Sequence, residues 1–220
     1  MRFDERRTLS AMLPPTIPLF PLPNVVLFPN VFLPLHVFED RYRDMVGDAL
    51  AEDRIIGMVL LRPGWEEDYE GRPAIYPVGC AGLITHAERL ADGRYNIVLQ
   101  GLEKFRVLDE DDSRSYRLAR VDGIEDVAAN GDDRDEMRLA RRRLEALLVP
   151  QPKGRGTDTR VPASMADEDL VNALAQYLEL EPVEKQALLE REGLLARCRS
   201  LIELLEMKVI VAQHKWGGEH

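Results

Sequence analysis

Glu39 stands close to Arg41 and Arg43 in the sequence, and a carboxylate beside two guanidinium groups could clamp the charged terminus of a peptide. The alternative is a local ion pair that joins a helix to a sheet. His36 precedes Asp40 by one helical turn, but no second histidine is near it. A hydrogen-bonded histidine at a corner is therefore favoured over a metal ligand.

Trp65 is a second residue that could contact a ligand. It stands in a polar, glycine-containing stretch beside Glu66, Glu67 and Asp68, where the sequence predicts no core. An exposed ring of this kind suits a ligand contact, and packing beneath its own loop is the alternative.

The sequence carries none of the catalytic motifs that these residues would need for a reaction. It has no G-x-x-x-x-G-K-[ST] loop for nucleotide phosphates, no G-x-S-x-G elbow and no H-E-x-x-H pair. The acidic run from Asp109 to Asp112 lacks the spacing of a calcium loop and fits the solvated tip of a hairpin. We therefore expect a protein that is not an enzyme and has no cofactor and no metal.

The elements that position the candidate residues begin with a proline-rich apolar stretch. Prolines cannot donate to a sheet ladder, so the apolar pieces between them are expected to be short edge or barrel strands joined by corners. From Phe38 the apolar residues recur every three to four positions, which predicts a helix with Glu39 and Asp40 in its first turn. Residues 16 to 50 thus predict strand, corner, strand, corner, strand and helix. The prolines concerned are Pro18, Pro21, Pro23, Pro29 and Pro34.

Residues 79 to 124 predict a β-meander. The turn Ala91-Asp92-Gly93 lies between two alternating stretches, which is typical of a hairpin. Gly101 is expected to end the second of these strands, and the acidic run to separate the next strand from Tyr116 to Val121.

From Asp126 onward the pattern is helical. The sequence predicts two domains, a β-rich one at residues 14–125 and a helical bundle at residues 126–216. The helices are expected to end at Leu148, to restart at Ser164 or Asp167, to break at Glu181-Pro182, and to finish with Leu194 to about His214, with a loop from Pro150 to Pro162.

Several of these stretches resemble the N-terminal domain family of Lon proteases. The resemblance lies in Pro18 to Phe28, Leu33 to Glu39, Arg41 to Arg43 and the hairpin region Gly79 to Val107. It implies an α+β fold, with an N-terminal PUA-like β pseudobarrel containing one early helix, followed by a C-terminal helical bundle. Asn30 replaces the usual glycine, and since asparagine tolerates a left-handed backbone the corner is expected to survive.

The resemblance also implies a function. The chain is expected to be a stand-alone, non-catalytic module without the ATPase and peptidase domains, binding exposed apolar segments of unfolded or partner proteins. A PUA-like binder of RNA or of a small ligand is the alternative, and an unrecognised hydrolase ranks last. The candidate peptide-binding residues are Pro34, Leu35, His36, Glu39, Tyr42 and Trp65.

The composition of the chain limits the kinds of molecule that it is expected to bind. A net charge of −10 disfavours nucleic acid, because a general binder of phosphates needs a cationic surface. The arginines at 138 and 141–143 alternate with glutamates and fit a solvated helix face. No membrane-length apolar run or secretory signal is visible, so a cytoplasmic protein is expected, with Cys80 and Cys198 as buried free thiols. No oligomeric state is predicted.

Overall fold

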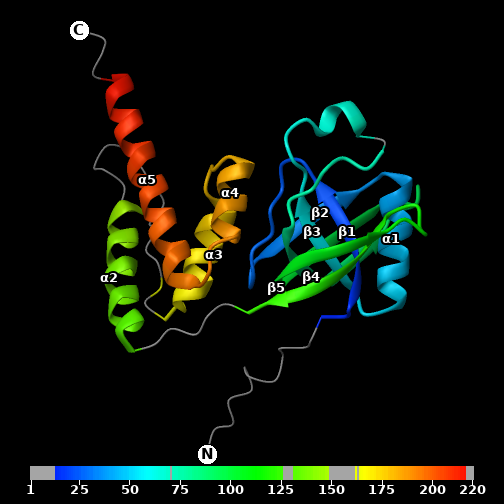
Figure 1. Ribbon diagram of the computed structural model, residues 1–220, viewed down its shortest axis with the longest axis horizontal. Coiled ribbons are helices and arrows are strands. Elements are labelled where there is room, and N and C mark those ends of the chain that lie inside the picture. The colour runs from blue at the N-terminus through cyan, green and yellow to red at the C-terminus, as the bar shows by residue number, and fades with distance from the viewer. Residues whose placement is uncertain (1–12, 70, 126–130, 149–161, 163, 217–220) are drawn as a thin grey trace, which may run out of the picture. The chain divides into compact units, whose positions relative to one another are not determined.

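The computed structural model describes residues 13–69, 71–125, 131–148, 162 and 164–216 of the chain. The chain divides into two compact units, Met1–Glu125 and Asp126–His220. The first unit is rich in β-structure and contains one α-helix, and the second is helical (Figure 1).

The β-rich unit contains a six-stranded sheet with strand order β2-β5-β4-β3-β1-β6. Since β5 also pairs with β6, five of these strands close into a ring, and β2 pairs with β5 alone among the described strands. All pairings are antiparallel except the parallel pair of β1 and β3. The closed ring confirms the predicted pseudobarrel. Its elements are β1 (Thr16–Leu22), β2 (Phe32–Val37), α1 (Asp40–Ala51), β3 (Ile55–Leu60), the short 3-10 helix η2 (Trp65–Asp68), β4 (Val78–Arg89), β5 (Tyr95–Asp111) and β6 (Arg117–Ile124).

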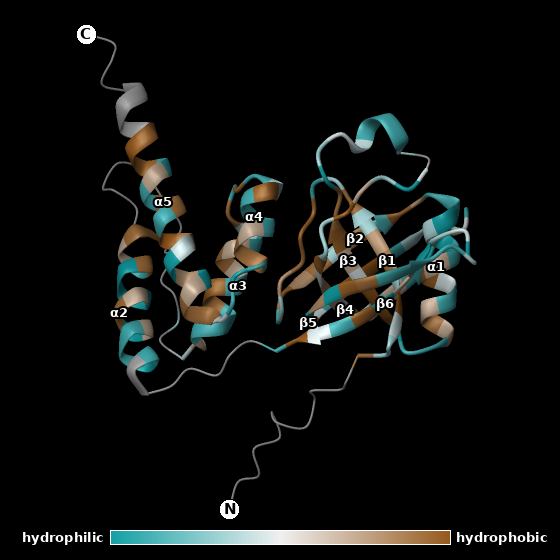
Figure 2. Ribbon diagram, in the orientation of Figure 1, coloured by the Kyte–Doolittle hydropathy of each residue, from teal (hydrophilic) through white to brown (hydrophobic). Residues whose placement is uncertain are grey.

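Strand β1 shows how a proline-rich sequence enters a barrel. Its first half, through Leu19, pairs with β6, and its second half, from Leu19 on, pairs with β3. Pro18 and Pro21 therefore each lie in a half of β1 that pairs with only one of the described strands. A proline is tolerated there because the position of its missing N–H can face the side without a paired strand. The side chains of Ile17 and Leu19 lie on the opposite side of the strand from Pro18 and are buried in the core, whereas Pro21 lies on their side and is also buried. Much of the sheet is brown in Figure 2.

The middle strand predicted between residues 23 and 31 does not form, and this prediction is wrong. The segment is irregular, although Leu27 and Phe28 are fully buried. Asn30 adopts the left-handed conformation with φ 62°, as predicted, and its N–H donates to the carbonyl of Gly101 (2.9 Å). The Gly101 N–H in turn donates to the carbonyl of Val31 (2.8 Å). The backbone of this segment thus finds its partner in β5 without becoming a strand.

Gly101 does not end a strand, which corrects a second prediction. Strand β5 runs through it to Asp111, pairing first with β2 and then with β6. A Cβ at this position would lie 2.0 Å from the backbone oxygen of Phe28. The glycine therefore permits a close approach of two backbones inside a continuous strand.

The hairpin predicted at residues 91–93 is present. Leu90 N–H donates to the carbonyl of Arg94 (2.8 Å), and Gly93 has a φ of 84°. Glycine supplies this left-handed turn position without steric cost.

Helix α1 places the predicted apolar stripe against the sheet. Its buried residues are Tyr42, Met45, Val46 and Ala49, which recur at helical spacing. Tyr42 packs on Phe20 of β1, with ring centroids 4.5 Å apart. The helix begins at Asp40, two positions after the predicted start.

The helical unit contains four helices among its described residues. Helix α5 contacts the other three, and α4 begins with a capping box in which the Glu184 side chain accepts from the N–H of Glu181 (2.8 Å). The predicted loop at 150–162 lies outside the described residues except for Pro162. The helices are α2 (Gly131–Leu148), α3 (Asp167–Tyr177), α4 (Pro182–Leu189) and α5 (Leu194–Trp216).

A fully buried arginine joins three of these helices. Arg197 of α5 donates from Nη1 to Asn172 Oδ1 of α3 (2.8 Å) and from Nε to the carbonyl of Leu188 in α4 (3.3 Å). Buried charge is tolerated only with such hydrogen bonds, so this side chain fixes how α3, α4 and α5 meet.

Both cysteines are free and buried, Cys80 in β4 and Cys198 in α5, each with 0% exposure. Burial raises the pKa of Cys198 to about 11. Since the thiolate is the reactive form, we expect neither thiol to react with an aromatic disulfide reagent in the native protein near neutral pH, and both to react in denaturant. Rapid labelling of either thiol under native conditions would contradict this burial.

Candidate functional site

The structure separates the six candidate residues. Pro34, Leu35 and His36 lie in β2, Glu39 and Trp65 belong to a second group around the loop that bears η2, and Tyr42 lies in the core. Pro34 and His36 point outward from β2 on the same side as Phe32, whereas Leu35 lies on the opposite side and is half-buried. Phe32 is 48% exposed, and Phe38, which follows the strand, is 61% exposed. We name Phe32, Pro34, His36 and Phe38 the β2 face.

The β2 face changes from apolar to polar along its length. Phe32 and Pro34 lie opposite Gln100 and Val98 of β5, while His36 lies opposite Asn96. The ring of Phe38 stacks on that of His36, with centroids 6.3 Å apart. One end of the face therefore offers apolar surface and the other end offers polar groups beside an aromatic ring.

A hydrogen-bonded row fixes the orientation of His36. Asn96 Nδ2 donates to Glu88 Oε2 (3.0 Å), so the Asn96 Oδ1 atom is left as an acceptor, 2.8 Å from His36 Nδ1. His36 Nδ1 therefore carries the proton, and Nε2 accepts from Arg94 Nη1 (3.2 Å). The hydrogen bonds agree with the prediction for His36, but the residue lies within strand β2 and not at a corner.

Glu39 belongs to the second group, which ties the loop bearing η2 to the start of α1. Its Oε1 accepts from the hydroxyl of Tyr69 (2.6 Å), and its Oε2 accepts from Arg41 Nε (3.0 Å). Arg41 also lies over the Tyr69 ring, 5.2 Å from the centroid. Burial and the bond to Glu39 raise the pKa of Tyr69. With both carboxylate oxygens engaged, the arrangement favours the local ion pair over a clamp for a peptide terminus.

Trp65 packs on its own loop. Its ring meets that of Tyr69 edge-on, with centroids 5.4 Å apart, and the residue is half-buried. It follows Gly64, whose φ of 91° turns the chain into η2. The structure thus supports the packing alternative for Trp65 while leaving part of the ring at the surface.

Tyr42 does not offer its ring to a ligand. The side chain is 4% exposed and packs on Phe20. The prediction that Tyr42 contacts a peptide is therefore wrong, and its ring belongs to the core beneath the site. The helical period explains this, because Tyr42 stands one turn before Met45 and Val46 on the same buried stripe.

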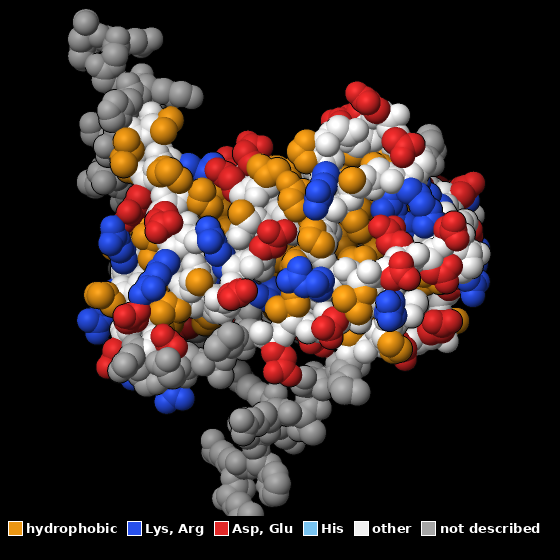
Figure 3. Space-filling view, viewed as in Figure 1, with side chains coloured by type: hydrophobic (Ala, Val, Ile, Leu, Met, Phe, Trp, Pro, Cys, Tyr) orange, Lys and Arg blue, Asp and Glu red, His pale blue; other side chains and the backbone are white. Residues whose placement is uncertain are grey.

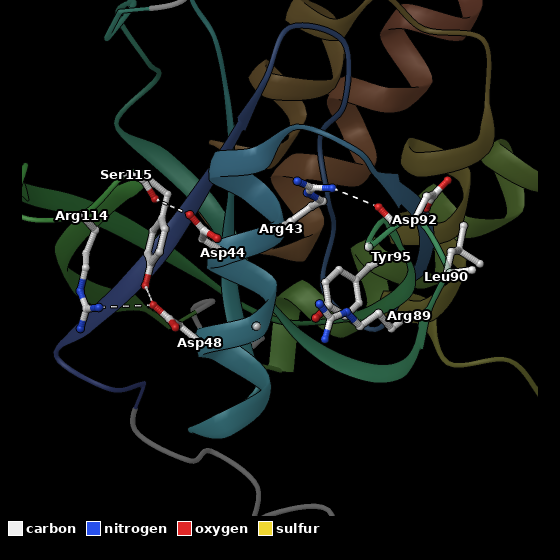
Figure 4. A pocket seen from close by; sticks show the side chains of 13 residues that line it. Arg43, Asp44, Asp48, Arg89, Leu90, Asp92, Tyr95, Arg114 and Ser115 are labelled. Carbon is white, nitrogen blue, oxygen red and sulfur yellow. Dashed lines mark hydrogen bonds and ion pairs between the residues drawn. The ribbon is translucent and has the colours of Figure 1, made fainter.

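A polar pocket of about 830 Å³, which the sequence does not predict, opens beside α1 (Figure 4). Three chain segments far apart in sequence form it: one face of α1, the β4–β5 hairpin and the turn before β6. Gly47 leaves room on the helix face, since a Cβ there would meet only the Tyr95 hydroxyl, at 4.0 Å. The residues that line it are Arg43, Asp44, Gly47, Asp48, Arg89, Leu90, Ala91, Asp92, Gly93, Tyr95, Arg114, Ser115 and Tyr116.

The charges in this pocket largely satisfy one another. Asp48 accepts from the hydroxyl of Tyr116 (2.7 Å) and pairs with Arg114 (3.5 Å), and Asp44 accepts from Ser115 (3.1 Å), as the dashed lines of Figure 4 show. Burial, with the bond to Asp48, raises the pKa of Tyr116 to about 12. Three arginines and three aspartates line the pocket, so its charge favours neither anions nor cations.

The described part of the chain shows neither a metal-binding cluster nor a membrane-spanning helix. Within it, no group of three His, Cys, Asp or Glu side chains is placed to hold a metal ion. Among the same residues, no helix is both long enough and apolar enough to cross a bilayer.

The ring of strands with an early helix, followed by helices, is the fold of solved Lon N-terminal domains. It matches the N-terminal domain of a Mycobacterium avium complex Lon protease with a TM-score of 0.65 at 16% identity, over 87% of this chain and 98% of that chain. A Lon N-terminal domain protein from Xanthomonas campestris matches with a TM-score of 0.55 at 25% identity, over 87% and 97%. These likenesses establish the α+β class, with a β pseudobarrel and an early helix followed by C-terminal helices.

Residues 16–207 match the family model of the ATP-dependent protease La (LON) substrate-binding domain, so the chain belongs to this family. It is 32% identical over 202 residues to Lon protease 2 of Myxococcus xanthus and 31% identical over 202 residues to a Lon protease of Anaeromyxobacter dehalogenans. Each alignment covers 89% of this chain and 24% of the relative. The chain thus spans about a quarter of the length of the curated relatives that it matches.

Proposed function

We propose that this chain is a non-catalytic module that binds extended apolar segments of unfolded or partner proteins on the β2 face. Membership of a substrate-binding family supports protein binding in general. The observation that carries the proposal for the β2 face is the exposure of Phe32 in β2 and of Phe38 directly after it, at 48% and 61%. Among the described strands, β2 pairs on one side.

The β2 face suits an extended peptide for two physical reasons. Aromatic rings bury a large apolar area with little loss of side-chain freedom, and the exposed rings flank Pro34 on the same side of the strand. The side of β2 on which no described strand pairs can offer backbone groups to an added strand, although Pro34 supplies only its carbonyl there. The missing donor limits continuous pairing and so restrains self-association through this edge.

Affinity is expected to be weak. A site that accepts many unfolded sequences cannot fix the side-chain geometry of its ligand, so dissociation constants of about micromolar or poorer are expected.

Replacing Phe32 with alanine is expected to weaken binding of a labelled, permanently unfolded apolar polypeptide by about 1 to 2 kcal/mol, the scale of a lost aromatic contact. Fluorescence anisotropy titration measures the effect, and Phe38→Ala should act in the same direction. Both residues are exposed, so the melting temperature is expected to stay nearly unchanged.

Leu108→Ala is the matched control, because Leu108 is 50% exposed but lies near the far end of β5. Equal titrations for wild type and both phenylalanine variants, or an equal loss in the control, would move the binding surface away from β2. Trp65→Ala separates the two groups of candidate residues. A loss similar to that of Phe32→Ala would extend the surface to η2, and no loss would confine Trp65 to packing.

RNA or small-ligand binding remains the alternative function. The net charge of −10 disfavours RNA, whereas the polar pocket beside α1 has room for a small molecule. A labelled RNA oligonucleotide in the same assay is expected to give no saturable change in anisotropy.

A further inference from the structure

A groove of about 340 Å³ lies between α4 and α5 in the helical unit. Val183 of α4 and Met207 of α5 form its open walls and are 48% and 54% exposed, while Leu188 closes its base. Methionine adapts to partners of different shape, which suits a docking surface. The groove is lined by Val183, Glu184, Ala187, Leu188, Arg191, Ser200, Glu203, Leu204 and Met207.

Helix α5 is apolar on two faces, and this explains the groove. Cys198, Leu201 and Ile202 are buried in the core of the helical unit. A second stripe, Leu204, Met207 and Val211, recurs at spacings of three and four on another side of the helix.

This second stripe continues past the groove into exposed surface. Ile210 and Val211 are 52% and 55% exposed and follow Met207 toward the end of the helix. The part of α5 before its grey end includes a brown stretch in Figure 2, and orange side chains gather there in Figure 3. A helix that is apolar on both sides requires a second burial surface, and two packed helices present a groove into which a third can lie.

The charged residues around the groove indicate whether its partner is cationic or anionic. The exposed carboxylates of Glu181, Glu190, Glu192 and Glu203 surround α4 and the adjoining part of α5. Lys208 pairs with Glu184 (3.1 Å), which largely neutralises its charge, and Arg191 is the cation among the residues that line the groove. The field at the rim is therefore negative and favours a cationic partner.

We propose that the α4–α5 groove receives an amphipathic helix of a partner protein whose apolar stripe is flanked by lysine or arginine. The stripe from Ser200 to Val211 of α5 is about 17 Å long at the helical rise, so it can hold about three turns of the partner helix. This binding mode is distinct from the proposed binding of extended segments on the β2 face, because it uses the helical unit and a partner in helical conformation.

The test uses two labelled synthetic helical peptides that share one leucine stripe and differ in carrying lysine or glutamate beside it. The full chain is expected to bind the lysine peptide at least about tenfold more tightly than the glutamate peptide. The double variant Val183→Ser/Met207→Ser is expected to weaken binding of the lysine peptide about tenfold or more, and Glu203→Lys is expected to reduce the preference between the peptides.

Leu139→Ser is the matched control, because Leu139 is 69% exposed on α2, and it should leave both titrations unchanged. Phe32→Ala should also leave them unchanged, which separates this proposal from binding on the β2 face. Equal affinity for the two peptides, or binding that survives the double variant, would overturn the proposal. A concentration-dependent dimer that the double variant abolishes would assign the groove to a second copy of the chain and overturn it as well.

Discussion

Replacing Gly101 with alanine is expected to destabilise the β-rich unit by about 3 kcal/mol or more. The added Cβ would lie 2.0 Å from the carbonyl oxygen of Phe28, and backbone cannot move aside as a flexible side chain can. Relief would separate the segment of Asn30 and Val31 from β5 and break the two hydrogen bonds that Gly101 makes with them. Urea unfolding followed by near-ultraviolet circular dichroism measures the loss of stability.

Gly47→Ala is the control with the opposite expected sign. Gly47 lies inside α1, and a Cβ there meets only Tyr95, at an ordinary contact distance of 4.0 Å. Alanine is the better helix former, so a gain of about 0.5 to 1 kcal/mol is expected. If Gly101→Ala were tolerated as well as Gly47→Ala, the close backbone approach at β5 would be wrong.

Replacing Arg197 with alanine is expected to destabilise the helical unit by about 3 kcal/mol or more. The change removes the donors to Asn172 and to the Leu188 carbonyl, and it leaves a cavity where a fully buried side chain stood. Loss of helical circular dichroism on heating or in urea reports this unit, because the β-rich unit contributes one α-helix among its described residues.

Two further variants separate charge from volume. Arg197→Met keeps most of the volume without the donors, so its loss is expected to fall between those of wild type and Arg197→Ala. Arg199 lies two residues further along α5, half-exposed and paired with Glu136, and its replacement by alanine is expected to change stability by about 0.5 kcal/mol or less. Equal effects of Arg197→Ala and Arg199→Ala would contradict the buried network.

The sequence predicts the architecture well because its patterns are local. The helical period after Phe38 predicts α1, and the Asp92-Gly93 turn predicts the β4–β5 hairpin. The errors arise where tertiary contacts decide. Residues 23–31 are apolar enough for a strand, yet their backbone bonds to β5 at Gly101 instead. A strand-interior glycine that permits such an approach looks, in sequence, like a strand end.

The candidate site was predicted less completely. The sequence predicts Pro34 and His36 at a corner of the site, whereas the structure places both within strand β2, pointing outward. Phe32 and Phe38 are not among the predicted site residues, although the alternation from Phe32 through Pro34 and His36 to Phe38 is a period-two signal that indicates them. The tie between Glu39 and Tyr69 joins residues 30 positions apart, and the α1 pocket gathers three separate segments. Neither the Glu39–Tyr69 hydrogen bond nor this pocket can be predicted from a single sequence, because both depend on residues that are far apart along the chain.

Hydrogen–deuterium exchange in the presence of a saturating, permanently unfolded apolar polypeptide tests the central claim most directly. Binding on the β2 face predicts slower exchange at the amides of Phe32, His36 and neighbouring residues of β2, with little change in the pocket beside α1 or in α4 and α5. Unchanged exchange throughout β2, with protection confined to another part of the chain, would contradict it.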